Sequence, residues 1–387
     1  MSNLPESIES LQHAAALVAR EVLAVHAPTV DREASWPERS LRAVGDAGLL
    51  GLHVPRRLGG LEEGMLALVV VTEALARECP STALCYGMHC VATAVLAAKA
   101  TPDHEDRYLL PIAEGRHFTS LALSEAGTGL HFYWPQTHLK RDGDWYVVSG
   151  TKQFVTSAGF ANSYVVTTSS AHPASGEAGE FSALIVEAGR AGAVWEGEWQ
   201  GLGMRGNASK ALRLIDVRVP VTQLLGKEGD EVWYVFEVIA PYFLMAMSAV
   251  YLGIASAALE LALSDARGRE YAHTGQTLSA EPVVQYRMAD LWLRDQQARQ
   301  LVYEAARLAD MGDPSTLAML LGSKTVAATA AVDIANGALD LGGGRAYREN
   351  GRLAQLLRDA RAGHVMAPTT DLLKVWLGRS ILDVPLL

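Results

Sequence analysis

The hydrophobic periodicity of this chain changes twice, and this limits the folds open to it. Up to about residue 117, apolar residues recur every three or four positions, the period of an amphipathic helix. From Phe118 to Leu225 the period falls to two, in short β-branched runs broken by glycine, aspartate and serine. From about Glu228 onward the pattern is helical again. The order predicts a β domain between two α-helical domains.

The predicted protein is therefore of the α+β multidomain class. We expect an N-terminal all-α domain over residues 1–117, a middle β-sandwich or barrel-like domain over 118–225, and a C-terminal helical bundle over 226–387. The predicted helices cover 5–27, a segment from about Ser35, 64–77, 80–99, 105–114, 231–267, 283–311, 314–338 and 369–381. The predicted strands include 120–124, 145–149, 164–168, 183–186 and 211–217.

One helical segment, Val238 to Leu259, carries no charged residue and is long enough to cross a bilayer. It contains Pro241, two serines, two tyrosines and many alanines, and Glu237 and Glu260 flank it. We therefore interpret it as the central helix of a bundle, apolar on all sides, and predict no membrane partner. The chain starts with the acidic and polar sequence MSNLPESIES, so no signal peptide is expected and a cytoplasmic location is predicted.

Charge and cysteine content exclude further classes of function. The formal net charge of -10 argues against a nucleic-acid partner, because phosphate binding needs a basic face. Cys79, Cys85 and Cys90 lie close together, and His89 is adjacent, but a fourth ligand at suitable spacing is missing. We predict no metal site and interpret the cysteines as small buried hydrophobic residues.

The stretch from Leu121 to Thr156 is the most informative for function. A hairpin is predicted around Asp142-Gly143, after which Gly150 to Lys152 is expected to break the strand before an extended run resumes. The loop from Ser124 to Gly129 is small and polar, and its glycines would let backbone N–H groups approach a ligand. Phe154, Val155 and Thr156 could stack on and hydrogen-bond a flat heterocycle. The alternative is a pair of β-hairpins with ordinary turns.

Five ordered segments resemble signatures of the acyl-CoA dehydrogenase family. LALSEAGTG and SGTKQFVTSAG resemble its flavin-binding signatures LTEP.AGSD and NGTK.WITN.G. LGMRGNASKALRLIDVRVP, at residues 202–220, is similar to LGMRGS…L.F.DV.VP. LGGGRAYREN, at 341–350, is similar to GG.GY, and LRDARAGHVMAPTTDLL, at 357–373, to RDAR…IYEGT..I. The chain is therefore identified as a divergent member of this family.

The resemblance implies FAD, bound between the middle β domain and the C-terminal four-helix bundle, in a homodimer or homotetramer. It assigns Leu123 and Ser124 to the loop at the edge of the isoalloxazine ring. It assigns Phe154 to the aromatic residue that packs on the flavin and Thr156 to the hydroxyl near flavin N5. For the pyrophosphate and adenosine side it implies the residues Gly343, Gly344 and Thr369. Arg358 would lie in a turn of structural importance.

Several residues that the family needs for its chemistry are replaced. The usual catalytic glutamate, which takes a proton while flavin N5 takes a hydride, falls on Ala367, and the base position of a minority of members falls on Phe243. The serine near the thioester-bearing arm falls on Leu130, followed by His131. The arginine of an R..FG motif has no clear match, and Asp340 replaces a glutamine. Methyl and phenyl groups cannot abstract a proton.

The identity of the base stays open at this point. Weak candidates for the base are His89 and Asp371, followed by His364 and His131. The ordinary interpretation of each histidine is a structural role. The expected substrate wall comprises Leu130, His131, Tyr86 and Phe243. Tyr86 shares with Met88 and His89 the helix that the resemblance places at the substrate pocket.

Three functions compete. The first is an FAD-dependent oxidoreductase that desaturates the Cα–Cβ bond of an acyl thioester, bound to CoA or a carrier protein, and passes electrons to a partner flavoprotein. The alternatives are a flavin-dependent monooxygenase on the same scaffold, for which a general base is less necessary, and a non-catalytic flavin-binding protein.

Overall fold

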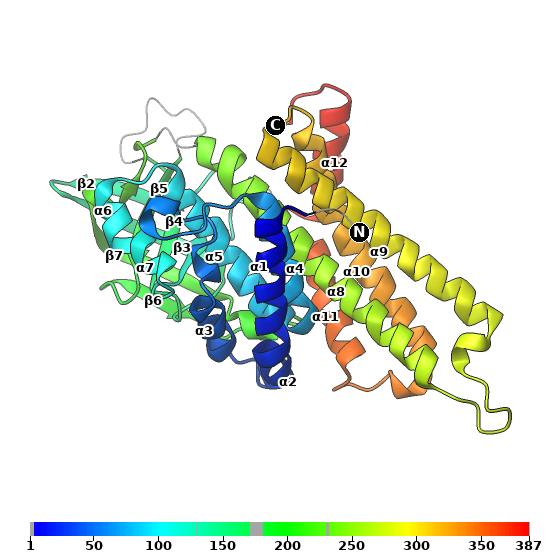
Figure 1. Ribbon diagram of the computed structural model, residues 1–387. Coiled ribbons are helices and arrows are strands. Elements are labelled where there is room, and N and C mark those ends of the chain that lie inside the picture. Colours follow the sequence, from blue (N-terminus) through cyan, green and yellow to red (C-terminus); the bar gives the residue numbers. More distant parts are fainter. Residues whose placement is uncertain (1–3, 130, 171–180, 230–231, 387) are drawn as a thin grey trace.

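The computed structural model describes residues 4–129, 131–170, 181–229 and 232–386. The strands gather at one end of the molecule and the long helices α8 to α12 lie at the other, with α1 running between them (Figure 1). Helices come first, strands second and helices last. The predicted fold class, a β domain between two helical domains, is confirmed.

The N-terminal region differs from prediction mainly in where its helices end. Its elements are α1 (Glu6–Val18), a π-helical turn (Ala19–Leu23), α2 (Ala24–Glu33), α3 (Glu38–Asp46), α4 (Met65–Glu78), α5 (Pro80–Ala98), α6 (Pro102–His104), a π-helical turn (Glu105–Leu109) and α7 (Leu110–Ala113). The first helical stretch runs past the predicted end at residue 27 because the π-helical turn connects α1 to α2 and Pro28 is accommodated within α2. The next helix starts at Glu38, and Ser35 does not cap it.

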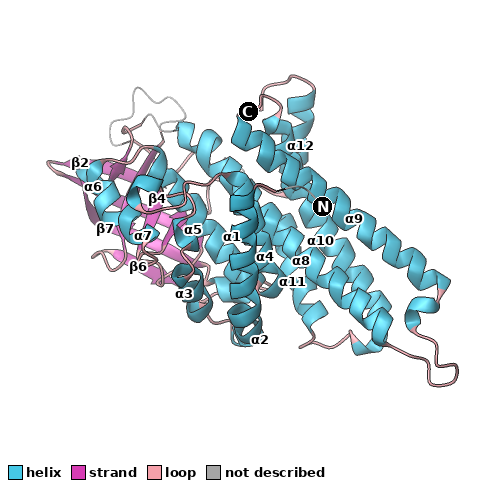
Figure 2. Ribbon diagram, in the orientation of Figure 1, coloured by secondary structure: helices cyan, strands magenta, loops and turns pink. Residues whose placement is uncertain are grey.

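Two four-stranded sheets form the β domain (Figure 2). The strands are β1 (Thr119–Ala122), β2 (His138–Asp142), β3 (Trp145–Val155), β4 (Ser163–Thr168), β5 (Ser182–Glu187), β6 (Ala193–Glu196), β7 (Lys210–Pro220) and β8 (Leu224–Leu225). Their orders are β1-β4-β5-β8 and β2-β3-β7-β6, and among the strand pairs of the described residues only β1–β4 is parallel. Every residue of β4 is buried, because α5 and the second sheet cover the two faces of the first.

Strand β3 corrects one prediction. The break expected at Gly150 to Lys152 is absent, and β3 runs unbroken to Val155. The irregular sequence is accommodated instead by register shifts against β7, between Val148 and Gly150 and between Lys152 and Val155. Such β-bulges bend a strand and re-aim its side chains without ending it.

The C-terminal region forms an antiparallel helical bundle. Its helices are α8 (Ala240–Gly268, preceded by a π-helical turn Tyr234–Ile239), α9 (Pro282–Met311), α10 (Thr316–Gly342), α11 (Arg352–Val365) and α12 (Thr370–Ile381). Helix α11 was not predicted, so Arg358 lies in a helix and not in a turn.

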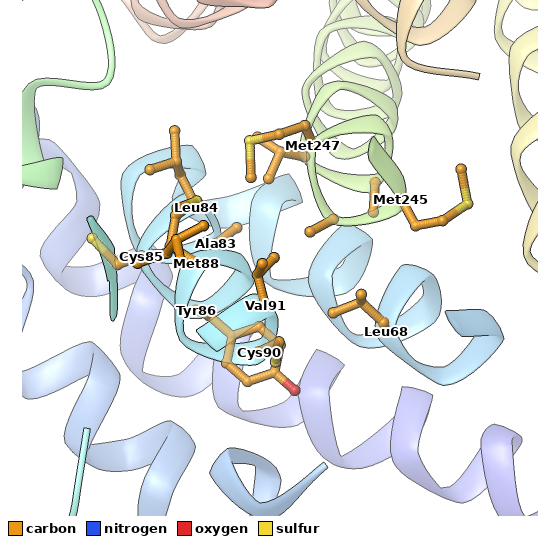
Figure 3. Close-up of a cluster of buried hydrophobic side chains, with 14 of the residues drawn as sticks. Leu68, Ala83, Leu84, Cys85, Tyr86, Met88, Cys90, Val91, Met245 and Met247 are labelled. Carbon is orange, nitrogen blue, oxygen red and sulfur yellow. The ribbon is translucent and has the colours of Figure 1, made fainter. Parts of the chain in front are cut away.

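In the part of the chain that the structure describes, three helical stretches are long and apolar enough to cross a membrane: Pro80–Ala98, Tyr234–Gly268 and Thr316–Arg345. In their most apolar windows, 89%, 78% and 67% of the residues are buried inside the protein. Figure 3 shows Met245 and Met247 of α8 among buried side chains of α4 and α5, including Leu68 and Leu84. Packing against neighbouring helices therefore accounts for this apolarity, as predicted for the central helix.

Candidate functional site

A cavity of about 570 Å³ lies where the β domain meets the C-terminal bundle. One wall is the end of β1 with Leu123 and Ser124, and a second is the end of β3 with Phe154 and Thr156. The loop of residues 199–209 forms the rim. The start of α8 and the segment 358–368 complete the enclosure.

The four residues to which the sequence assigned the flavin ring lie around this single cavity. Leu123, Ser124, Phe154 and Thr156 all line it, although they lie at the ends of β1 and β3, which belong to different sheets. In the described part of the chain, the hydroxyls of Ser124 and Thr156 make no recorded hydrogen bond, so both are available to a ligand.

Phe154 has an unusual backbone and an unusual exposure. Its φ is +54°, in the left-handed region that non-glycine residues rarely adopt, and Ser157 nearby has a φ of +59°. The bulge between Lys152 and Val155 turns the ring outward, so 69% of Phe154 is exposed. Strained backbone of this kind collects at ligand-binding positions, because the rest of the fold must hold it there.

A buried ion pair fixes the loop that carries Leu123 and Ser124. The ammonium of Lys152 donates to Glu125 (2.5 Å), to Thr167 on β4 (2.9 Å) and to the Leu123 carbonyl (3.3 Å). Glu125 also accepts from the backbone N–H of Gln136 at 2.6 Å. Burial alone would raise the pKa of Glu125, but Lys152 and these donors hold the pKa below its ordinary value. The pair thus connects both sheets to the cavity wall.

Charged groups from the two helical regions hold the rim. The Arg358 guanidinium donates to both oxygens of Asp31 on α2 (3.0 and 2.5 Å) and to the Leu202 carbonyl (3.0 Å). Asp359 accepts from the backbone N–H of Met204 at 2.6 Å, and burial raises the pKa of this carboxyl to about 6. A Cβ on Gly203 would lie 2.2 Å from the Arg358 carbonyl oxygen, so glycine is required for this approach.

The cavity offers no strong proton acceptor among the residues that the structure describes. No aspartate, glutamate or histidine belongs to its described lining. Ala367 and Phe243, the two positions where the resemblance would place a base, both line the cavity. Methyl and phenyl groups therefore face the space where a base would act.

His89 is not positioned for proton transfer. It is fully buried outside the cavity lining, where the Thr119 N–H donates to Nδ1 (3.1 Å) and Nε2 lies 3.0 Å from the Leu50 carbonyl. The ring stacks on Phe118 at 4.7 Å, and burial lowers the pKa of His89 to about 4. It is a neutral imidazole that connects α5 to β1.

The other candidate bases also lie outside the described lining of the cavity. Asp371 is exposed in the first turn of α12. His364 lies with Nδ1 3.2 Å from the Thr370 hydroxyl, and burial lowers its pKa. His131 is exposed, with Nδ1 2.8 Å from the hydroxyl of Tyr133.

The expected substrate wall is only partly assembled. Phe243 lines the cavity, whereas Leu130 falls outside the described residues. Tyr86 lies in the core, where its hydroxyl donates to the Leu49 carbonyl at 3.0 Å, and Met88 faces the cavity in its place. Figure 3 shows Tyr86 beside Cys90 on the far side of α5 from Met247.

The residues assigned to the adenosine side also lie outside this cavity lining. Gly343 begins a short 3₁₀ helix with a φ of +58°, and Gly344 is exposed beside it. The Thr369 hydroxyl accepts from the backbone N–H of Leu372 and so caps α12.

Several lining residues had not been singled out from the sequence. Trp199 and the segment from Gly201 to Met204 form the rim, and Phe132, Arg361 and Met366 complete the walls. The sequence did mark some of these residues. The LGMRG signature lies on this rim, and Arg361 and Met366 lie in the RDAR signature. Phe132 belongs to the aromatic-rich stretch from His131 to Trp134, which the monooxygenase alternative would place at the substrate pocket, whereas Trp199 carries no comparable signal.

The described residues contain no group of three or more histidine, cysteine, aspartate or glutamate side chains that could hold a metal ion. Cys79, Cys85 and Cys90 are buried and unpaired, and burial raises the pKa of each thiol.

Three domain models match almost the whole chain. The N-terminal domain of acyl-CoA dehydrogenase matches residues 5–116, the middle domain 120–217 and the C-terminal domain 243–382. A cyclohexane-1-carbonyl-CoA dehydrogenase of Geobacter metallireducens is 30% identical over 386 residues, covering 99% of both chains. The probable acyl-CoA dehydrogenase YngJ of Bacillus subtilis is 28% identical over 365 residues, covering 94% of this chain and 95% of the relative.

Solved structures of other proteins share this fold. A chain from work on the electron transferring flavoprotein of Acidaminococcus fermentans has a TM-score of 0.92 at 27% identity, and the match covers 99% of each chain. The butyryl-CoA dehydrogenase of Megasphaera elsdenii has a TM-score of 0.91 at 24% identity, with 99% of this chain and 100% of that chain covered, and it supports the same fold.

Proposed function

The chain belongs to the acyl-CoA dehydrogenase family, and on that premise we propose that it is an FAD-dependent oxidoreductase that desaturates the Cα–Cβ bond of an acyl thioester. The observation that carries the proposal is the single cavity that brings Ser124, Phe154 and Thr156 together between the strands and the bundle.

The cavity fits a flat, partly polar ring. Phe154 and Leu202 are each 69% exposed and Val365 is 71% exposed, although all three line the cavity. Apolar area of this kind is unfavourable in water and would be covered by a planar heterocycle. The hydroxyls of Ser124 and Thr156 stand beside that surface to accept or donate hydrogen bonds.

The remaining walls suit an uncharged, apolar acyl group. Met88, Leu121, Phe132, Ile239 and Phe243 form an apolar part of the lining. When bound, an oxidised flavin would accept the hydride that leaves Cβ, and the Cα proton would pass to water, because no base belongs to the described lining. The chain's residues then have to orient the thioester against the ring, because alignment of the reacting atoms supplies much of the rate enhancement.

Anaerobic titration of the flavin-loaded protein with a panel of acyl-CoA thioesters tests this function. We expect at least one acyl-CoA to bleach the flavin absorbance slowly, because the substrate is oriented but no strong base lines the described cavity. The free acids of the same chains serve as controls, and they should leave the absorbance unchanged. Absence of bleaching with every thioester would refute the proposal and favour the oxygen-using or non-catalytic alternatives.

Removing the side chains that are expected to contact the flavin ring should weaken flavin binding. Phe154→Ala is expected to raise the Kd of FAD about tenfold, because an aromatic contact contributes roughly 0.5–1.5 kcal/mol beyond buried area. Thr156→Val keeps the shape of the wall but removes the hydroxyl. Fluorescence titration of the apoprotein measures both variants. Phe160→Ala, an exposed phenylalanine of the β domain outside the cavity lining, is the control and should keep the native Kd.

We further propose a cytoplasmic homodimer or homotetramer that passes its electrons to a partner flavoprotein. Support for assembly comes from large apolar side chains exposed on the bundle, namely Tyr286, Trp292 and Leu293 on α9 and Ile381 and Leu382 at the end of α12. The substrate would be bound to CoA or to a carrier protein.

A further inference from the structure

A lysine lies buried directly behind one wall of the cavity. Lys324 of α10 is fully buried, and its ammonium lies 3.1 Å from the Gly363 carbonyl, 2.8 Å from that of Met366 and 2.8 Å from that of Pro368. In the part of the chain that the structure describes, no ion pair with a carboxylate is recorded for it. The three donors of the ammonium are therefore all used by one short backbone segment.

The three carbonyls are suited to a cation. Gly363 lies in the last turn of α11, where carbonyls lack helical partners and carry the negative end of the helix dipole. A buried ammonium is costly unless its donors are satisfied, so the segment and the lysine stabilise each other. Burial lowers the pKa of Lys324 to about 7, and the neutral amine would still have two N–H donors.

The segment that Lys324 holds forms part of the cavity wall. Val365, Met366, Ala367 and Pro368 all line the cavity, and residues 366–369 belong to no helix or strand. Besides Lys324, the Tyr251 hydroxyl contacts this segment, 3.3 Å from the sulfur of Met366. Among the described residues, few side-chain hydrogen bonds therefore reach this wall.

We propose that Lys324 is a positioning residue that fixes the wall of residues 365–368, and with it the placement of Ala367 in the cavity that Phe154 and Thr156 also line. The effect on backbone order follows from the contacts alone. The effect on turnover rests on the proposed function.

Hydrogen exchange and kinetics of Lys324→Met test the proposal. The variant keeps an unbranched chain but loses all donors, and we expect amides of residues 364–369 to exchange about tenfold faster or more, since hydrogen bonds to charged groups are among the stronger ones. With a thioester that reduces the wild-type flavin, we expect kcat to fall about 10²-fold with little change in KM, because the thioester is still bound but misaligned. Lys324→Gln keeps an amide donor and should give an exchange rate between those of the wild type and Lys324→Met. If Lys324→Met does not fold, the exchange rate of Lys324→Gln at residues 364–369 tests the proposal.

Ser323→Ala is the matched control, because this buried hydroxyl on the same helix donates only to the Met319 carbonyl within α10. It should leave exchange at 364–369 unchanged. The proposal is overturned if folded Lys324→Met or Lys324→Gln exchanges like wild type, or if Ser323→Ala loosens the segment equally. Faster exchange in a protein whose flavin no thioester reduces would support the positioning role and refute the proposed function.

Discussion

Replacing Ala367 with glutamate is expected to raise the rate at which an acyl thioester reduces the bound flavin by about 10²- to 10⁴-fold, the range that a positioned general base contributes. Ala367 lines the cavity, and the described lining contains no carboxylate or histidine that the new group would merely duplicate. Desolvation by the apolar part of the walls would raise the pKa of the introduced carboxyl, whereas Arg358 and Arg361 of the same lining would lower it and keep the carboxylate in its basic form.

The measurement is the anaerobic rate of flavin bleaching after rapid mixing with the acyl-CoA that reduces the wild type. Ala367→Gln is the matched control, since it adds the same bulk without a base and should not accelerate the reaction. Phe243→Glu would place a carboxylate on α8, from another wall of the same cavity. A folded, flavin-loaded Ala367→Glu protein that bleaches no faster than the glutamine variant would show that proton abstraction is not the limiting step.

Breaking the buried Lys152–Glu125 pair is expected to cost about 3–5 kcal/mol of stability, because either partner alone is left as an uncompensated buried charge. Both side chains are almost completely buried and connect the two sheets to the loop of Leu123 and Ser124. Lys152→Met and Glu125→Gln should therefore unfold at lower denaturant concentration and also release flavin more readily.

Chemical denaturation followed by circular dichroism and flavin fluorescence measures both effects. The exposed pair Arg218–Asp142 in the same domain is the control, and Arg218→Met should change stability little. The double variant Lys152→Met/Glu125→Leu should recover part of the loss, because it leaves no unpaired charge. Equal destabilisation by the surface and buried variants would contradict this account. Since the pKa of Glu125 is lowered, its stabilising contribution is complete above the ordinary glutamate pKa and is lost as pH falls through the lowered one.

The sequence was sufficient to predict the helix–strand–helix order and the assembly of Leu123, Ser124, Phe154 and Thr156 around one cavity. The order follows from the period of the apolar residues, which depends on local geometry. The four cavity residues were recognisable because they lie in motifs whose spacing resembles a family. Neither argument needs tertiary contacts. The predicted order is confirmed, and flavin binding by the four residues stays a prediction.

Other features depend on contacts that a single sequence does not reveal. Helix α5 is buried on nearly all sides, so no polar face shows that Met88 lines the cavity while Tyr86 points into the core. Strand β3 continues past Gly150 because bulges against β7 absorb the irregularity. Lys324 is one of three charged residues in the largely apolar helix α10, and its carbonyl partners lie about forty residues away in α11 and beyond it.

The ion pair between Asp31 and Arg358 joins the leading helices to the rim of the cavity, far away in the sequence. A polypeptide without helices α1 and α2 would lack Asp31 and would therefore lose this clamp on the rim. A shortened version of this protein would need a new carboxylate to pair with the Arg358 guanidinium.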